Sequence, residues 1–207
     1  MSKRIGIVDY GSGNIYSLQR GVRAVGYEAT IITDPGSLTE YDCLILPGVG
    51  AFGDAMEKIR KRELERPLAE YVASGRPLLG ICLGMQLLLS KSHELGIHQG
   101  LGFIDGEVRE IPRTTGVMIP HIGWVVLIPR SDWKHTALEN ISPKDEFYFV
   151  HSFTCHPLDQ KAVLATCLYG DYEFVSVIGQ RNVFGCQFHP EMSSKPGLRL
   201  LRDFMNL

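Results

Sequence analysis

The sequence predicts an α/β protein: a mainly parallel central sheet flanked by helices, with an added antiparallel β region. Two observations carry this prediction. In the first ninety residues, β-rich runs alternate with segments of helical periodicity, which is typical of a parallel sheet. Between residues 103 and 188, short strand-like runs follow one another with few helical periods, which indicates antiparallel strands. We expect residues 1–207 to form a single domain, since this length can bury a sizeable core.

The first half is expected to hold four strands. The helix after the first strand is marked by Ile15, Leu18, Val22 and Val25 at helical spacing, and Gly26 ends it. A second helix places Phe52, Met56 and Ile59 on one side, and a third lies around Leu68 and Val72. The expected strands cover 4–10, 29–32, 42–46 and 78–81. In such sheets the reacting groups collect at the carboxyl ends of the strands.

The second half is expected to add its strands to one edge of this sheet. The final segment, 197–207, returns to a helical pattern. The strand-like runs cover 107–111, 124–128, 147–150, 162–165, 174–178 and 183–188.

Composition excludes several classes of protein. A formal net charge of -2 gives no electrostatic argument for binding nucleic acid or an anionic membrane. No apolar run is long enough to span a bilayer and no signal-peptide pattern is present, so we expect a cytoplasmic protein without a membrane partner. Five scattered cysteines without Cys-x-x-Cys spacing argue against disulfides and zinc, and neither a metal nor a cofactor is expected. Three of them lie in strand-like segments and are most simply core residues: Cys43, Cys167 and Cys186.

Cys82 has a different setting. It lies between the apolar run that ends the fourth strand and the apolar run that begins a helix, and the segment 80–84 has the spacing of a nucleophile elbow with cysteine at its centre. Side chains at Gly80 or Gly84 would collide where the strand and helix backbones approach each other. A thiol at a helix N-terminus is favoured as the thiolate, which suits a nucleophile. The alternative is one more buried cysteine.

A nucleophilic cysteine needs a base and an orienting carboxylate. Of the seven histidines, His189 stands out because it follows directly on a strand and is joined to Glu191 through Pro190. In an extended stretch His189 and Glu191 project from the same face, so the carboxylate can reach the imidazole. The alternative is a surface histidine beside a proline turn. The elbow and the His-Pro-Glu segment together are far more specific than either alone.

These two segments resemble the class I, triad-type glutamine amidotransferases. Three further segments, 47–53, 120–124 and 148–152, are similar to those of the glutaminase subunit of imidazole glycerol phosphate synthase. The resemblance covers essentially the whole chain and implies a class I glutamine amidotransferase-like fold.

The resemblance also implies roles for individual residues. Cys82 would attack the side-chain amide of glutamine, His189 would protonate the departing ammonia, and Glu191 would orient His189. The backbone N–H groups of Val49 and Leu83 would form the oxyanion hole, and the glycines around Val49 make a peptide flip there sterically cheap. The residues expected around the substrate glutamine are Gly50, Gly53 and Gln86.

The partner implied by the resemblance is a cyclase-type synthase subunit, forming a heterodimer to which the ammonia is passed. For Trp124 and Tyr148 the alternative is ordinary packing of the β region. The chain departs from the family at Val125, where asparagine is usual, and at Met192, where lysine or arginine is usual. The residues expected near the partner-binding face are His121, Trp124, Tyr148, His151 and Met192.

Three functions stay open from the sequence. The first is ammonia supply for imidazole glycerol phosphate and AICAR in histidine biosynthesis, or, in a paralogue, for amidation of a nucleotide sugar in surface-polysaccharide biosynthesis. The second is a stand-alone γ-glutamyl hydrolase, and the third is a catalytically silent regulatory module. The absence of an acceptor domain in 207 residues favours the first. Intact Cys82, His189 and Glu191 weigh against the third.

Overall fold

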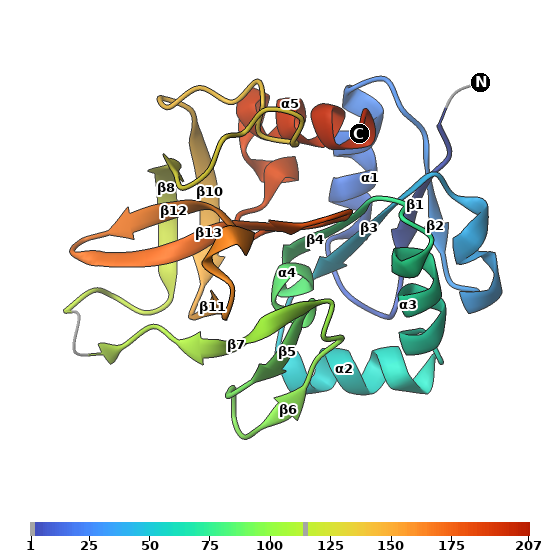
Figure 1. The fold of residues 1–207 in the computed structure, drawn as a ribbon, viewed down its shortest axis with the longest axis horizontal. Helices are drawn as coiled ribbons and strands as arrows, with labels where there is room; N and C mark the ends of the chain where they lie inside the picture. Colours follow the sequence, from blue (N-terminus) through green and yellow to red (C-terminus); the bar gives the residue numbers. More distant parts are fainter. Residues whose placement is uncertain (1–2, 114–115) are drawn as a thin grey trace.

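The computed structural model describes residues 3–113 and 116–207, and within them a 12-stranded mixed sheet runs through the molecule (Figure 1). The strand order is β2-β1-β3-β4-β14-β13-β11-β7-β5-β6; in addition, β12 pairs with β13, and β9 pairs with β12. The elements of the first half are β1 (Ile5–Val8), α1 (Ile15–Ala24), β2 (Ala29–Ile32), β3 (Cys43–Gly48), α2 (Phe52–Lys61), α3 (Glu65–Ala73), β4 (Leu78–Cys82) and α4 (Leu83–Leu87).

The centre of the sheet is parallel, as the sequence predicts. Strands β1, β2, β3 and β4 pair in parallel, and β14 (Val183–Cys186) adds to β4 in the same direction with Cys186 opposite Ile81. Since β14 comes from the far end of the chain, the residues that follow it arrive at the edge of the sheet where Cys82 ends β4. This pairing positions the site.

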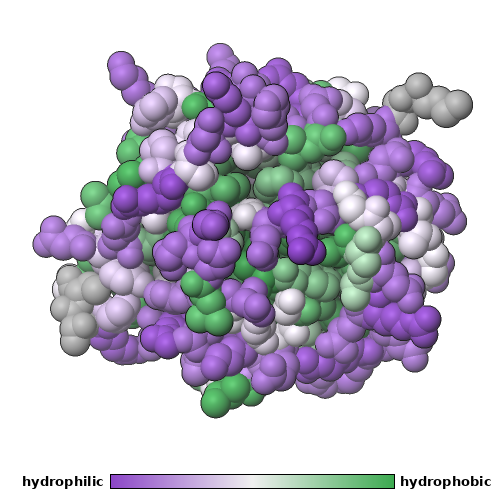
Figure 2. Space-filling model, viewed as in Figure 1, coloured by the Kyte–Doolittle hydropathy of each residue, from purple (hydrophilic) through white to green (hydrophobic). Residues whose placement is uncertain are grey.

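Alternation along the strands produces a hydrophobic core on each face of the sheet. On one face Ile5 and Ile7 pack against α1 and against α5 (Ser194–Met205), the C-terminal helix. On the other face Val8 and Leu44 pack against α2 and α3. The two pairs of helices lie on opposite sides of the sheet in Figure 1. Hydrophilic side chains cover much of the surface in the same view, with apolar residues between them (Figure 2).

The β region is partly antiparallel and differs from the expected arrangement. Strands β8 (His121–Val126) and β10 (Glu146–His151) form a separate two-stranded sheet instead of extending the edge of the main one. The other elements of this region are β7 (Ile104–Glu110), β9 (Ile128–Pro129), β11 (Phe153–Pro157), β12 (Val163–Tyr169) and β13 (Tyr172–Gln180), with short 3-10 turns at Pro35–Glu40, Gln160–Ala162 and Pro190–Met192.

Three further differences concern single elements, and the first lies next to Cys82. The helix after the elbow ends at Leu87, and the apolar run continues as β5 (Leu89–Ser92), which pairs in parallel with β7 and antiparallel with β6 (His98–Gln99). A short apolar run fits a helix or a buried strand equally well. Here residues 89–92 form a strand because they pair with β7. Strand β11 is absent from the expected strands. Helix α5 begins three residues before the expected start at Gly197.

Candidate active site

Cys82 occupies a strained turn between β4 and α4. Its backbone has φ 54 and ψ -111, a conformation that non-glycine residues rarely adopt and that is often found at functional positions. A Cβ atom on Gly84 would lie 1.8 Å from the carbonyl oxygen of Leu46, and one on Gly80 would lie 2.6 Å from that of Gly84. The predicted need for glycine on both sides of Cys82 is therefore confirmed.

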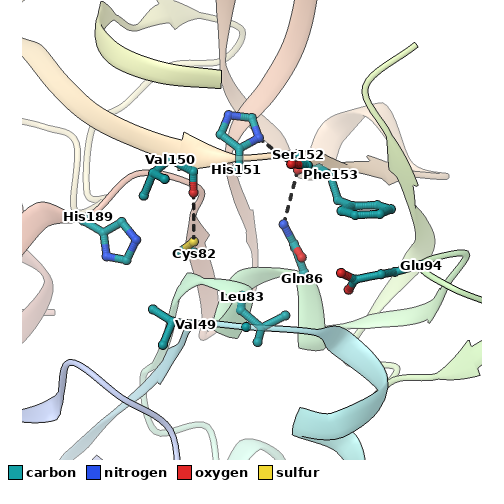
Figure 3. Close-up of a pocket in the computed structure, with 11 residues that line it drawn as sticks. Val49, Cys82, Leu83, Gln86, Glu94, Val150, His151, Ser152, Phe153 and His189 are labelled. Carbon is teal, nitrogen blue, oxygen red and sulfur yellow. Dashed lines mark hydrogen bonds between the residues drawn. The ribbon is translucent and has the colours of Figure 1, made fainter. Parts of the chain in front are cut away.

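His189 and Glu191 meet directly after β14. Nδ1 of His189 lies 2.9 Å from Oε1 of Glu191, and both side chains are buried. The contact forms through the 3-10 turn Pro190–Met192 and not through the extended backbone that the sequence suggested. Figure 3 shows the imidazole turned toward the sulfur of Cys82. Burial alone would lower the pKa of His189, but the contacts with Cys82 and Glu191 outweigh it and raise the pKa to about 10.

Cys82 and His189 border a pocket of about 370 Å³, a size suited to a small metabolite. Of the residues expected at the substrate, Gly50 and Gln86 line it and Gly53 does not. Gly53 lies instead beneath the ring of His98, where an added Cβ would approach within 2.8 Å. The lining residues are Val49, Gly50, Cys82, Leu83, Gln86, Glu94, Val150, His151, Ser152, Phe153 and His189.

The pocket contains a carboxylate that the sequence did not predict. Glu94 follows β5, its side chain lines the pocket, and its Oε2 accepts a hydrogen bond from the backbone N–H of Phe52 at 2.7 Å. Figure 3 places it on the side of the pocket away from His189. No sequence pattern marks Glu94, because its place depends on the unexpected strand β5. It gives the pocket a group that can bind a cation.

The loop that carries Val49 is held by the loop after β1. The N–H of Val49, one of the two expected oxyanion donors, donates to Oγ of Ser12 at 3.3 Å. Gly50 has φ 98, where an L side chain would be strained even though nothing lies within 4 Å of the added Cβ. Leu83, the other expected donor, is the first residue of α4 and lines the pocket.

Asn14 is a second residue that the sequence did not indicate. Its backbone is left-handed at φ 68, which asparagine tolerates, and it precedes α1. From there its Nδ2 donates to Oε1 of Glu191 at 2.5 Å. The same oxygen contacts His189, while Oε2 is buried without a hydrogen-bond partner among the described residues. Asn14 thus helps to hold the carboxylate that orients the imidazole.

The residues expected at the partner face divide into two groups. Trp124 and Tyr148 lie together on the outer face of the β8–β10 sheet with ring centroids 5.7 Å apart, and Met192 is 48% exposed beside β10. The other exposed apolar residues of this surface, which we call the outer β8–β10 face, are Ile122, Val126 and Val150. Val150 also lines the pocket, so this face reaches the site.

The side chains of His121 and His151 do not point outward on that face, so they could meet a partner only through the residues above them. Both are buried beneath it, with Nδ1 of His121 3.1 Å from Nε2 of His151. Burial lowers their pKa values to about 4 and about 3. His121 is three positions from Trp124 and His151 three from Tyr148, and such spacing in a strand places side chains on opposite faces. Val125 likewise packs against the core.

Metal-binding clusters and membrane-spanning helices are both absent from the part of the chain that the structure describes. Within it, no group of three or more His, Cys, Asp or Glu side chains could hold a metal ion. No helix there is long and apolar enough to cross a membrane.

The sequence matches the family described as glutamine amidotransferase class-I over residues 6–207. It is 43% identical to imidazole glycerol phosphate synthase subunit HisH 1 of Legionella pneumophila (strain Lens), covering 98% of this chain and 99% of that protein. The HisH subunit of Aquifex aeolicus is 46% identical, covering 96% of this chain and 94% of that protein. A chain in the structure of PurLQS from Thermotoga maritima has the same fold, with a TM-score of 0.78, 22% identity and coverage of 100% and 99%.

Proposed function

The chain belongs to the class-I glutamine amidotransferases and, among them, to the HisH subunits of imidazole glycerol phosphate synthase, and from this membership we propose how its pocket works. It is a glutaminase subunit that hydrolyses glutamine to glutamate and ammonia. The ammonia passes to a cyclase-type synthase partner, which makes imidazole glycerol phosphate and AICAR in histidine biosynthesis. We also propose that this pathway operates in the cytoplasm.

In the proposed mechanism the thiolate of Cys82 attacks the side-chain carbonyl carbon of glutamine. The C–S bond forms and the carbonyl electrons move to oxygen, where the N–H of Leu83 binds the charge. The N–H of Val49 joins it once it has left Oγ of Ser12 and turned toward the pocket. Each donor of this kind typically contributes about 10²–10³ in rate. Protonated His189 gives its proton to the nitrogen, the C–N bond breaks, and ammonia leaves a γ-glutamyl thioester on Cys82. His189 then takes a proton from water, which attacks the thioester, and glutamate leaves as the thiolate of Cys82 is restored.

One observation carries this proposal above the others. Two neighbouring parallel strands end at one edge of the sheet, and there β4 presents Cys82 while the segment after β14 presents His189 and Glu191. The three lie at the border of a single pocket or directly behind it. Neither a buried structural cysteine nor a surface histidine would need this arrangement.

Substrate binding is proposed to use both ends of the pocket. Glu94 would pair with the α-ammonium group of glutamine, while the side-chain amide reaches Cys82. Gly50 and Gln86 would contact the substrate between them. Gly53 would act from behind the pocket wall by leaving room for the ring of His98.

The partner is proposed to dock on the outer β8–β10 face. This face combines exposed aromatic and aliphatic side chains, and Val150 connects it to the pocket. The carbonyl oxygen of Val150 is 3.9 Å from Sγ of Cys82, so ammonia released there starts next to the face that the partner would cover. This placement supports the proposal of a heterodimer in which the ammonia is channelled to the partner.

The exposure of Met192 favours a second candidate function. It is exposed where the family usually has a cation, which suits a paralogue whose partner supplies ammonia to a nucleotide sugar. Val125, the other departure from the family, does not distinguish the two candidates, because its side chain packs against the core. Copurification from the native source with identification of the bound subunit, followed by assay of its product from glutamine, distinguishes the two. A lone chain with full glutaminase activity would instead indicate a γ-glutamyl hydrolase.

A further inference from the structure

Gln187 lies between β14 and His189 and has no role in the mechanism above. Its side chain is fully buried, and its backbone N–H donates to the carbonyl of Ser176 at 2.9 Å. The side-chain carboxamide lies between two residues of the site. Its Nε2 is 3.7 Å from Sγ of Cys82, and its Oε1 is 3.0 Å from Nε2 of Gln86.

A backbone carbonyl fixes the orientation of both carboxamides. The carbonyl oxygen of Phe153 can only accept a hydrogen bond, and the amide nitrogen of Gln86 lies 3.3 Å from it. That nitrogen can only donate, so the atom of Gln187 beside it must be the oxygen. The nitrogen of Gln187 is therefore the atom that faces the sulfur of Cys82.

This orientation has consequences at both ends of the pair. At the sulfur, Gln187 offers an N–H donor, which favours the thiolate, whereas the carbonyl of Val150 at 3.9 Å can only accept from the neutral thiol. At Gln86, both amide hydrogens have acceptors in the protein, namely the oxygens of Phe153 and Gln187. Gln86 is left to present its side-chain oxygen to the pocket, where it accepts a hydrogen bond from a bound ligand.

We propose that Gln187 is a positioning residue that stabilises the Cys82 thiolate through Nε2 and sets the carboxamide of Gln86 through Oε1. The inference rests on the proposed function in taking Cys82 as the nucleophile and Gln86 as a substrate contact. Because the side chain is buried behind both residues, it acts through them and does not reach the substrate itself.

Two substitutions separate the two contacts. Gln187→Met keeps the length of the side chain and removes both hydrogen bonds. Gln187→Glu keeps an oxygen for Gln86 and presents a second oxygen, in place of the N–H, to Cys82. Thr154→Val serves as the control: Thr154 is equally buried and follows Phe153, but its hydroxyl bonds His156 and Tyr172 outside this pair. Melting temperatures report whether each variant folds.

The first readout is the rate at which iodoacetamide alkylates Cys82 in the full chain, located by mass spectrometry, at pH 7 and without glutamine. We expect both Gln187 variants to react about three- to tenfold more slowly than wild type, since each loses a hydrogen bond to the charged sulfur. Thr154→Val should react within about twofold of wild type. Alkylation of Gln187→Met at the wild-type rate, with a wild-type melting temperature, would overturn the proposal. If that variant does not fold, Gln187→Glu decides by the same criterion.

The second readout is the KM for glutamine in the complex with the synthase partner. Gln187→Met should raise KM about tenfold, and Gln187→Glu should leave it within about twofold while lowering kcat. Equal KM values for the two variants would overturn the role toward Gln86. If wild type fails to turn over glutamine while the alkylation difference persists, the proposed function is wrong and the contact between Gln187 and Cys82 stands.

Discussion

Asn14 and Glu191 are 177 positions apart in the sequence, yet the amide of one donates to the carboxylate of the other at 2.5 Å. The contact connects the loop after β1 with the turn that carries His189. It makes the carboxylate that orients the imidazole depend on a side chain from the opposite end of the chain. Ser12 in the same loop accepts a hydrogen bond from the N–H of Val49. One loop therefore contacts both Glu191 and an expected oxyanion donor.

Removing the amide of Asn14 should slow catalysis without weakening substrate binding. Asn14→Gly keeps the left-handed backbone accessible and leaves Glu191 with one hydrogen bond fewer, so kcat for glutamine should fall about tenfold at unchanged KM. Asn14→Asp sets a second carboxylate against Glu191 and should lower kcat further. Steady-state kinetics of the complex measure both, and a change in kcat of less than twofold in either variant would contradict this role.

The raised pKa of His189 predicts an alkaline limit to activity. The ring must be protonated to give its proton to ammonia, so kcat should hold through neutral pH and fall as pH rises through about 10. The contacts of protonated His189 also stabilise the folded state. This stabilisation is complete below the ordinary histidine pKa of about 6.5, and it is lost as the pH rises through the pKa of about 10 that His189 has in the folded protein. Titration of the His189 ring by NMR checks the shift. Glu191→Gln should lower its pKa, and an ordinary value in wild type would refute the account.

Ser12 should restrain the isolated subunit. Ser12→Ala frees the N–H of Val49, so glutaminase activity of the chain without its partner should rise about threefold, while the partner-activated rate changes by less than twofold. Ser17→Ala, on the exposed side of α1 near Arg20, is the matched control. Ammonia release measured with and without the partner tests this, and equal basal rates for Ser12→Ala and wild type would rule out the restraint.

Met192 should report on the chemistry of the partner. If the partner has an apolar or neutral group opposite it, Met192→Lys should weaken binding about tenfold, because the new charge loses water without gaining a counter-ion. Trp124→Ala should weaken binding by about 30-fold, as expected for an exposed aromatic anchor that the partner covers. Leu158→Ala, exposed elsewhere, should not weaken it. Calorimetry with the native partner measures all three. Tighter binding by Met192→Lys would indicate an acidic group opposite it, as in a conventional histidine-pathway cyclase.

Local pattern predicted the parallel half of the sheet and the turn at Cys82, because buried strands, glycines at close approaches and helical spacing all act over a few residues. The contact between His189 and Glu191 was also predictable, since the two residues are only two positions apart in the sequence. What the sequence did not indicate depends on pairing between distant segments. Glu94 reaches the pocket only because β5 pairs with β7, and Asn14 and Gln187 act through residues more than a hundred positions away.

Strand spacing predicts which of the residues expected near the partner point outward. The three-residue separation between His121 and Trp124 already places them on opposite faces of a strand, yet both were expected at the partner surface because they share a motif. A shared motif records that residues belong to one family pattern, and it does not state which way each side chain points. Burial of His121 and exposure of Trp124 follow from the alternation alone.

The variant Cys82→Ala, studied in the complex, tests whether Cys82 releases ammonia from glutamine for a separate synthase. The synthase product is measured once with glutamine and once with ammonium chloride as the nitrogen source. We expect glutamine-dependent synthesis to disappear and ammonia-dependent synthesis to stay within about twofold of wild type, because the partner's chemistry does not involve Cys82. Glutamine-dependent synthesis that survives in Cys82→Ala would contradict this role of Cys82.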